Sequence, residues 1–216
     1  MVVSVHIPKC AGTSFRCFAD RIYGSRAWYN YGTIFSRDQA ALEIIPRGTR
    51  FIHGHFIADA FDDILPARTL ITWVRDPVER VVSNYYHFLR APDMRDDCCR
   101  QLHEHRLGLR EFADLDWMRN MASRYVAGKP VDDFGFVGIA ERFEESIRKF
   151  CGIFGFRQLP VLPRENINPD RKTERYELSS GDRAHILERN TADMAWYETA
   201  LSRLTQARPK QTLRVG

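Results

Sequence analysis

Short apolar segments alternate with amphipathic segments along this chain of 216 residues. Continuous apolar runs indicate buried strands, and apolar residues spaced three and four apart indicate helices. The runs predict strands at 2–7, 50–55, 69–74 and 134–139. The spacing predicts helices at 15–22, 58–65, 78–89, 140–150 and 182–204, with one or two more within 109–126. Strands that alternate with helices are typical of an α/β protein with a parallel sheet.

Three stretches lack a clear pattern of apolar residues. Residues 24–36 are aromatic and polar, and we assign no element to them. Residues 91–108 are charged and predict a loop or lid, while the Pro, Asn, Arg and Lys of 157–181 predict a long loop. The length favours a single domain at 1–207, followed by a frayed tail at 208–216.

Composition narrows the class of protein. The net charge of +4 is too small to indicate a nucleic-acid partner. The five cysteines are odd in number and lack paired spacing, which argues against disulfides and zinc and favours reduced thiols in a cytosol. No apolar run approaches the length of a transmembrane helix, and the N-terminus does not resemble a secretory signal. We therefore expect a cytoplasmic protein.

The first candidate site is the turn between the first strand and the first helix. Small residues there let backbone N–H groups approach an anion at a helix start, and the lysine adds a charge. The order of residues is not that of a Walker A motif, because no Ser or Thr directly follows the lysine. An ordinary strand-to-helix turn fits the spacing equally well. The candidate residues are Lys9, Cys10, Ala11, Gly12, Thr13 and Ser14.

A second loop has the same architecture. Arg75 follows a buried strand, at the end where open α/β sheets bind ligands, and Pro77 favours a helix start. Ser83 lies two helical turns further, on roughly the same side as Arg80. The alternative is that Arg75 and Asp76 form a structural pair at the helix start.

The two loops together resemble a sulfotransferase family that includes the heparan sulfate 2-O-sulfotransferases. The resemblance rests on Pro-Lys-x-x-x-Thr-Ser at 8–14 and Arg-Asp-Pro-x-x-Arg-x-x-Ser-x-Tyr at 75–85. A His-Gly-His lies between them at 53–55, and residues 136–144 resemble the family's Val-Gly-x-x-Glu segment. Residues 170–174 resemble a basic loop near the family's C-terminus.

The resemblance implies a P-loop-like three-layer fold, in which helices flank a central parallel sheet. It implies 3′-phosphoadenylyl sulfate as co-substrate, adenosine 3′,5′-bisphosphate as product and no metal. Residues of the first loop would hold the 5′-phosphosulfate, although Cys10 replaces a Thr of many relatives. Arg75 and Ser83 would bind the 3′-phosphate. The basic loop would close over the same phosphate, or be solvated, and its candidates are Arg171, Lys172 and Thr173.

The mechanism implied is in-line transfer to a hydroxyl of a carbohydrate or glycoconjugate. A base must take the hydroxyl proton, and histidine suits this near neutral pH. His55 is the candidate base, His53 the alternate or an orienting partner, and Lys9 would neutralise the leaving oxygen. Either histidine could instead cap a strand end.

Two other functions compete with this interpretation. A P-loop kinase-like phosphotransferase would also bind phosphates at these loops, but the hydroxyl that would hold magnesium beside Lys9 is missing. A non-catalytic nucleotide-binding protein would not need the combination of Lys9, His55, Arg75 and Ser83.

Overall fold

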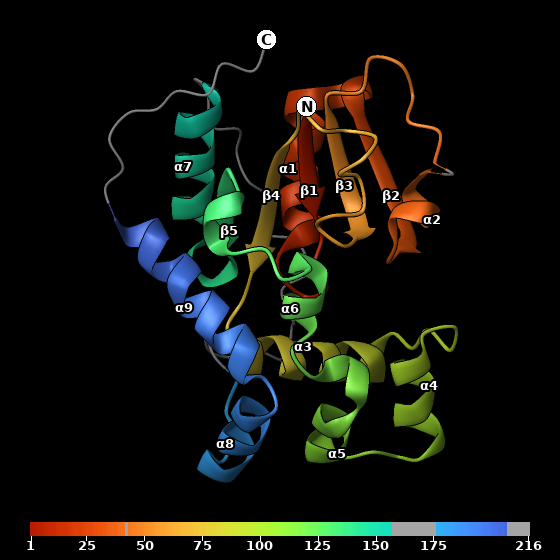
Figure 1. Ribbon diagram of the computed structural model, residues 1–216. Helices are drawn as coiled ribbons and strands as arrows, with labels where there is room; N and C mark the ends of the chain where they lie inside the picture. Colours follow the sequence, from red (N-terminus) through yellow and green to blue (C-terminus); the bar gives the residue numbers. More distant parts are fainter. Residues whose placement is uncertain (42, 157–175, 207–216) are drawn as a thin grey trace.

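Five parallel strands form the centre of the protein, in the order β2-β3-β1-β4-β5 (Figure 1). The computed structural model describes residues 1–41, 43–156 and 176–206. The strands are β1 (Val2–Val5), β2 (Ala27–Ile34), β3 (Phe51–Phe56), β4 (Thr69–Val74) and β5 (Phe136–Ile139). The fold is thus α/β with a central parallel sheet flanked by helices, as the sequence predicts.

Nine α-helices and four short 3₁₀ turns surround the sheet in the described residues. The helices are α1 (Gly12–Tyr23), α2 (Arg37–Ala41), α3 (Pro77–Arg90), α4 (Asp97–Glu104), α5 (Leu109–Asp114), α6 (Met121–Val126), α7 (Phe143–Phe154), α8 (Ser180–Glu188) and α9 (Thr191–Thr205). The 3₁₀ turns are η1 (Gly24–Arg26), η2 (Asp116–Met118), η3 (Val131–Asp133) and η4 (Ala140–Arg142).

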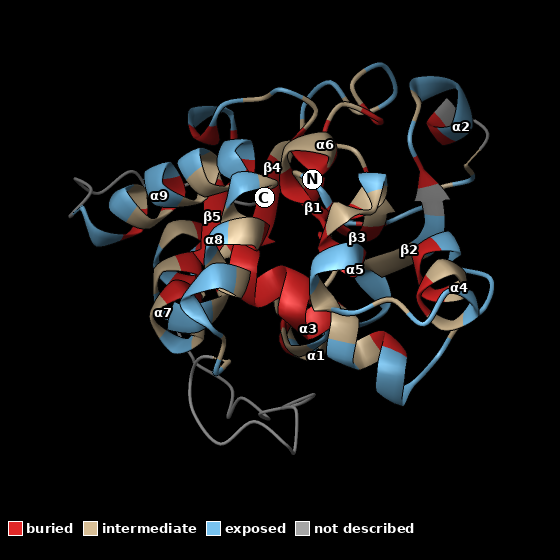
Figure 2. Ribbon diagram, turned by 90° about the horizontal axis from the view of Figure 1, so that it is seen from below, coloured by how far each residue is buried: buried red, intermediate tan, exposed pale blue. Residues whose placement is uncertain are grey.

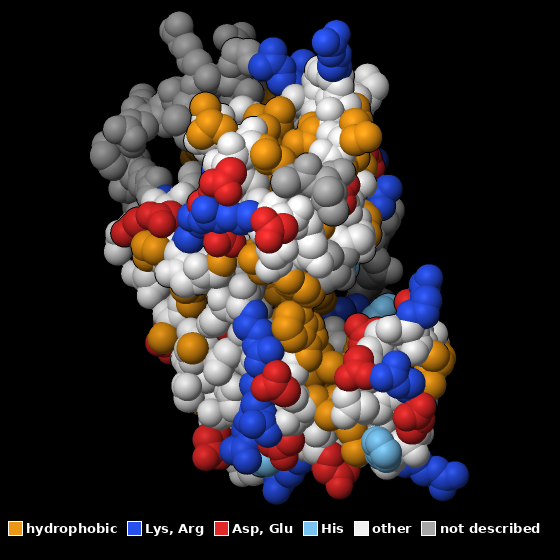
Figure 3. All heavy atoms as spheres, turned by 45° about the vertical axis from the view of Figure 1, so that its right-hand side comes forward, with side chains coloured by type: hydrophobic (Ala, Val, Ile, Leu, Met, Phe, Trp, Pro, Cys, Tyr) orange, Lys and Arg blue, Asp and Glu red, His pale blue; other side chains and the backbone are white. Residues whose placement is uncertain are grey.

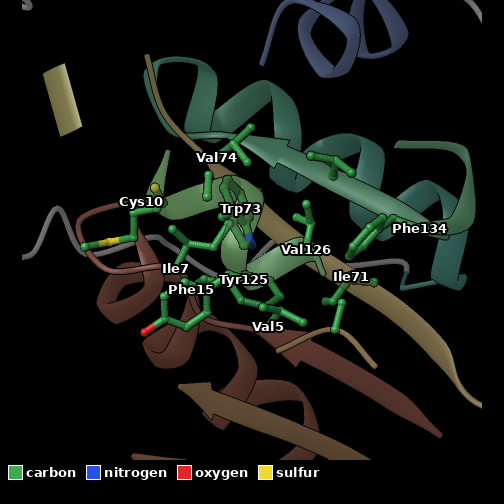
Figure 4. Packing of buried hydrophobic residues seen from close by; sticks show 14 of the residues in the cluster. Val5, Ile7, Cys10, Phe15, Ile71, Trp73, Val74, Tyr125, Val126 and Phe134 are labelled. Atoms are coloured by element: carbon green, nitrogen blue, oxygen red, sulfur yellow. The ribbon is translucent and has the colours of Figure 1, made fainter. Parts of the chain in front are cut away.

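Aromatic side chains hold α1 and α7 against one face of the sheet. The Phe15 ring of α1 lies 5.1 Å from Trp73 of β4 and 5.4 Å from Phe150 of α7, between ring centroids. Figure 4 shows Phe15 and Trp73 in the same buried cluster as Val5 and Val126. Burial of such large side chains is the main favourable term for a core of this kind.

The strand order places two loops at one end of the sheet. After β1, the chain forms β2 and β3 on one side of β1, and then crosses to form β4 and β5 on the other side. Ligands of open α/β sheets bind where the strand order reverses, beyond the carboxyl ends of the strands. The loops that follow β1 and β4 flank this point, because these two strands are neighbours.

A helical layer extends below the sheet. Helices α3, α4, α5 and α8 gather there (Figure 1). Seen from below, α3 is the buried helix at the centre of this layer (Figure 2). The helix is buried along most of its first half, which fixes the loop that precedes it.

Charges are mixed over the outer surface in the view of Figure 3. Acidic and basic side chains alternate there around a band of apolar side chains, and no broad basic patch is visible on this face. This distribution matches the small net charge of the sequence. Within the described residues, no helix is long and apolar enough to cross a membrane.

The structure corrects two of the predicted elements. Residues 58–65 form turns rather than a helix, because Ala58 donates its N–H to the Tyr125 carbonyl and Asp62 is held by Arg68 and Lys129. The helix predicted at 182–204 is two helices. Asn190 separates them, since its side chain accepts from the Asn120 N–H and donates to the Ile186 carbonyl.

The sequence pattern also missed strand β2 and helices α2 and α4. Strand β2 lies within the stretch 24–36, where Trp28, Tyr29 and Tyr31 have high strand propensity but polar residues interrupt the alternation. Helix α4 lies within the predicted loop 91–108. Asp96 caps it by accepting from the Cys99 N–H at 3.0 Å, and the helix buries little apart from its two cysteines and one leucine.

Candidate active site

The loop between β1 and α1 has an unusual backbone. Lys9 and Ala11 have φ angles of 65° and 62°, in the left-handed region that most side chains avoid. Ala11 is the N-cap of α1, makes no side-chain capping hydrogen bond, and is followed by a first turn without acidic residues. The first N–H groups of a helix lack acceptors within it and form the positive end of its dipole. The loop is therefore suited to bind an anion.

The Lys9 ammonium lies in a cationic environment. Burial, and then the charges of Arg75 and Arg90, lower the pKa of Lys9 to about 8. Placing like charges together costs free energy, and an anion bound between them offsets that cost. Strained backbone and a lowered pKa at the same residue make Lys9 a candidate for a functional site.

The other residues of this loop differ in how far their side chains are exposed to an anion. The Cys10 thiol is 1% exposed, and burial raises its pKa to about 12. Figure 4 shows Cys10 in the apolar cluster with Ile7, so Cys10 can face an anion only through its backbone. Gly12 is buried, Thr13 is exposed and Ser14 is half-buried.

The loop between β4 and α3 begins with a well-capped helix. Asp76 is the N-cap, and its Oδ1 accepts from the N–H groups of Val78 at 2.9 Å and Glu79 at 3.3 Å. Pro77 occupies the first helical position, where its missing N–H is not needed. The Asp76 carboxylate therefore caps α3 and does not serve as a partner for Arg75.

Arg75 joins the two loops. Its Nη1 donates to the Lys9 carbonyl at 3.4 Å, and its side chain is only 12% exposed. Two carboxylates lie near the guanidinium at long range, Glu79 at 3.9 Å and Glu141 at 3.8 Å. These distances are at the limit of an ion pair, so Arg75 retains donors for a phosphate.

The two carboxylates near the Nη2 and Nε atoms of Arg75 have other partners as well. Glu79 is 1% exposed and also accepts from the Tyr176 N–H and from Arg183. Glu141 lies at the start of η4 and accepts from the Asp76 N–H at 3.1 Å. The Val-Gly-x-x-Glu segment thus places its glutamate against the second loop.

Helix α3 carries two further polar residues into the interior. Ser83 is 8% exposed and lies two turns after Arg75, as predicted. Arg80 is fully buried and donates to the Met118 carbonyl at 2.7 Å and the Met121 sulfur at 3.3 Å. Its charge lies beneath the first loop, where it favours the thiolate of Cys10.

The two histidines of β3 differ in environment. His53 is fully buried, and its Nδ1 pairs with the Ser4 Oγ at 2.9 Å. Burial, aided by the charge of His55, lowers the pKa of His53 to about 3. His55 is half-buried, and burial lowers its pKa to about 4. Both rings are therefore neutral near pH 7, and His55 is the more exposed of the two.

A third histidine completes the cluster, and sequence analysis did not select it. The His6 ring stacks on His53, with centroids 4.8 Å apart, and lies 4.7 Å from the His55 ring. Tyr31 of β2 lies 5.2 Å from His55 and is 38% exposed. The alternation of residues places His6 on the same face of the sheet as Ser4, but its contact with His53 and His55 depends on how β1 pairs with β3, which the sequence does not reveal.

Some predicted site residues are not placed. Arg171, Lys172 and Thr173 lie outside the described residues. Within residues 1–41, 43–156 and 176–206, no group of three or more His, Cys, Asp or Glu side chains is arranged to hold a metal ion.

A family model covers most of this chain. The model of the sulfotransferase family matches residues 1–198. Among solved structures, the chain is similar to the one titled "Crystal Structure of Sulfotransferase from Alicyclobacillus acidocaldarius". The two are 14% identical, the TM-score is 0.49, and the match covers 93% of this chain and 95% of the other. No curated protein sequence matches this chain.

Proposed function

The chain belongs to the sulfotransferase family, and from this we propose that it uses 3′-phosphoadenylyl sulfate to sulfate a hydroxyl of a carbohydrate or glycoconjugate. The observation that carries the proposal is the joining of two phosphate-type loops by Arg75 and Lys9 at one end of the sheet. The histidine cluster lies beside the first of these loops.

The first loop suits the 5′-phosphosulfate of the donor. The start of α1 supplies backbone N–H groups, and Lys9 supplies a positive charge that forms no ion pair within the described residues. Thr13 and Ser14 would add hydroxyl donors, while Cys10 and Ala11 would contribute through the backbone. The basic residues Arg171, Lys172 and Thr173 remain part of the proposal as a cover for the 3′-phosphate.

The second loop suits the 3′-phosphate. Arg75 lies just beyond the carboxyl end of β4, with the carboxylates of Glu79 and Glu141 near its guanidinium. It can form bidentate hydrogen bonds with a phosphate. Ser83 would add a hydroxyl. ATP lacks a 3′-phosphate, so these two residues would select the sulfuryl donor over ATP.

His55 is the proposed base. It takes the proton of the acceptor hydroxyl, whose oxygen bonds to sulfur while the bond from sulfur to the bridging oxygen breaks. The electron pair stays on the departing phosphate, whose charge Lys9 neutralises. The negative charge of the bound donor favours the protonated form of His55 and raises its pKa from the low value of the empty site. His53, held by Ser4, orients the pair.

The acceptor class and the compartment are further parts of the proposal. The resemblance to heparan sulfate 2-O-sulfotransferases favours a carbohydrate, and the exposed Tyr31 ring beside His55 offers a flat surface for a sugar. No disulfide joins the cysteines in the described part of the chain, which fits a reducing cytoplasm.

Thermal unfolding with different nucleotides tests the donor assignment. Adenosine 3′,5′-bisphosphate at one hundred times its Kd should stabilise the protein by about 2.7 kcal/mol. This corresponds to a rise in Tm of roughly 5–10 °C for a domain of this size. ADP and ATP at the same concentrations should raise the Tm less. A larger rise with magnesium and ATP would instead favour a phosphotransferase.

A further inference from the structure

His6 occupies the centre of the site. Its backbone N–H donates to the Gly54 carbonyl at 2.8 Å, which continues the pairing of β1 with β3 beyond Val5. Gly54 lies between His53 and His55, so the His6 ring faces both of theirs. The edge of the Tyr31 ring meets His6 as well, at 5.7 Å.

The other side of the His6 ring lies against the donor loop. A β-carbon at Gly12 would overlap the Nε2 and Cδ2 atoms of His6. Gly12 is the first residue of α1, so the ring fills the space between the helix start and the histidine pair. The absence of a side chain at Gly12 therefore serves the packing of His6 in addition to any approach of an anion.

The His6 ring is positioned by packing against His53, His55 and the start of α1. Its Nδ1 is buried and has no hydrogen-bond partner in the described part of the chain. Burial, followed by the charges of His53, His55 and Lys9, lowers the pKa of His6 well below its usual value. The ring is therefore neutral near pH 7 and adds no charge beside Lys9.

We propose that His6 is a positioning residue, which wedges between Gly12 and His55, fixes the distance from the base to the donor loop and keeps water from the His55 ring. The proposal rests on the proposed function only where it calls His55 the base. The physical effect on His55 follows from contacts of the protein alone. It predicts that the proton affinity of His55 depends on the side chain at position 6.

Several residues other than His6 also surround His55 and affect its pKa. His53 lies on the same strand, Tyr31 on β2, and His6 on the loop after β1. Positive charges reach the cluster from Lys9 of the first loop and Arg16 of α1. Burial is the cause of the low pKa of His55. Exposure of the His55 ring to water, rather than removal of a neighbouring charge, should therefore raise this pKa.

NMR titration of the histidine imidazole signals tests the proposal without donor or acceptor. In the wild-type protein, the His55 signal, assigned with His55→Gln, should titrate near pH 4. His6→Ala exposes the His55 ring to water and should raise the midpoint of the His55 titration by about one pH unit or more. Gly12→Ala, which displaces the ring of an unchanged His6, should shift it in the same direction. His6→Leu retains apolar cover of similar volume and should leave the midpoint within about half a pH unit of wild type.

His87→Ala supplies the matched control, because it removes a partly buried imidazole near Lys9 but outside the cluster. An unchanged His55 midpoint in both His6→Ala and Gly12→Ala overturns the proposal. If one of these variants does not fold, the other and His6→Leu still decide it. Adenosine 3′,5′-bisphosphate should bind His6→Ala within about threefold of wild type. Absence of binding to the wild-type protein would count against the proposed function, and leave the His55 titration result standing.

Discussion

Arg75 donates a hydrogen bond to the Lys9 carbonyl at 3.4 Å, across the end of two neighbouring strands. This contact joins a loop suited to a phosphosulfate with a loop suited to a second phosphate. A donor that carries both groups would bind both loops at once, whereas a nucleotide with phosphates at one position would engage mainly the first.

Arg75→Ala should weaken binding of adenosine 3′,5′-bisphosphate by about 10- to 100-fold. This factor corresponds to the free energy usually lost with a hydrogen bond between charged groups. ADP binding should change by less than about threefold, because ADP lacks the 3′-phosphate. Isothermal titration calorimetry gives both values. Arg95→Ala, at an exposed arginine of the loop before α4, is the matched control. Equal losses for the two nucleotides would show that Arg75 is structural.

The cap of α3 should matter for binding as well as for stability. Asp76→Ala and Asp96→Ala each remove an aspartate N-cap, from α3 and α4, and each should lower the free energy of unfolding by about 1 kcal/mol. Only Asp76→Ala disturbs the helix start next to Arg75, so only it should weaken binding of the bisphosphate. Urea unfolding and calorimetry separate the two effects. The prediction is contradicted if both variants bind the nucleotide equally well.

Binding of the bisphosphate should weaken in alkali through Lys9. The pKa of Lys9 is about 8, so its charge is present below pH 8 and is lost above it. A bound anion raises this pKa, and the affinity should fall between pH 8 and pH 10 by at most about tenfold per pH unit. Lys9→Met should remove this dependence, while Lys149→Met on α7 should retain it. A wild-type affinity that is constant from pH 7 to pH 9 would exclude Lys9 from the site.

Most of the sheet could be predicted from the sequence, because β1, β4 and β5 are short and largely apolar, and β3 begins with two apolar residues. Edge strand β2 could not, since its aromatic side chains face the histidines and α1 rather than forming a regular apolar face. Residues 58–65 also could not be predicted, because Asp62 forms ion pairs with Arg37 and Lys129, which are distant in the sequence, and the segment forms turns instead of a helix.

The candidate residues that share one loop could be selected from the sequence alone. The Lys9 and Arg75 loops follow directly from strand ends, and the structure places them in contact. His6 was overlooked because its role depends on the register between β1 and β3, which a single strand does not reveal. The burial of the Cys10 thiol likewise depends on which way a left-handed turn directs its side chain.

Acid should destabilise the protein through His53. The pKa of this buried ring is about 3, below the usual value near 6.5 of an unfolded chain. As the pH falls from 6.5 towards 3, the unfolded chain binds a proton that the folded protein does not, so stability decreases. His53→Gln should make the decrease shallower by about 1.4 kcal/mol per pH unit over this range. Urea midpoints between pH 7.5 and pH 4 measure it.

His105→Gln, at an exposed position, is the control for this titration. It should leave the slope of stability against pH as in the wild type. An identical slope in His53→Gln and wild type would mean that His53 does not remain neutral in the folded protein.

Transfer of label from 3′-phosphoadenylyl [³⁵S]sulfate measures the proposed reaction itself. The protein is incubated with this donor, and in parallel with γ-labelled ATP and magnesium, together with carbohydrate extracted from its source cells. We expect ³⁵S in carbohydrate and an equal amount of adenosine 3′,5′-bisphosphate, with a rate that falls about 10²–10⁴-fold in His55→Ala at unchanged donor affinity. Transfer of labelled phosphate from ATP, with none of sulfate, would contradict it.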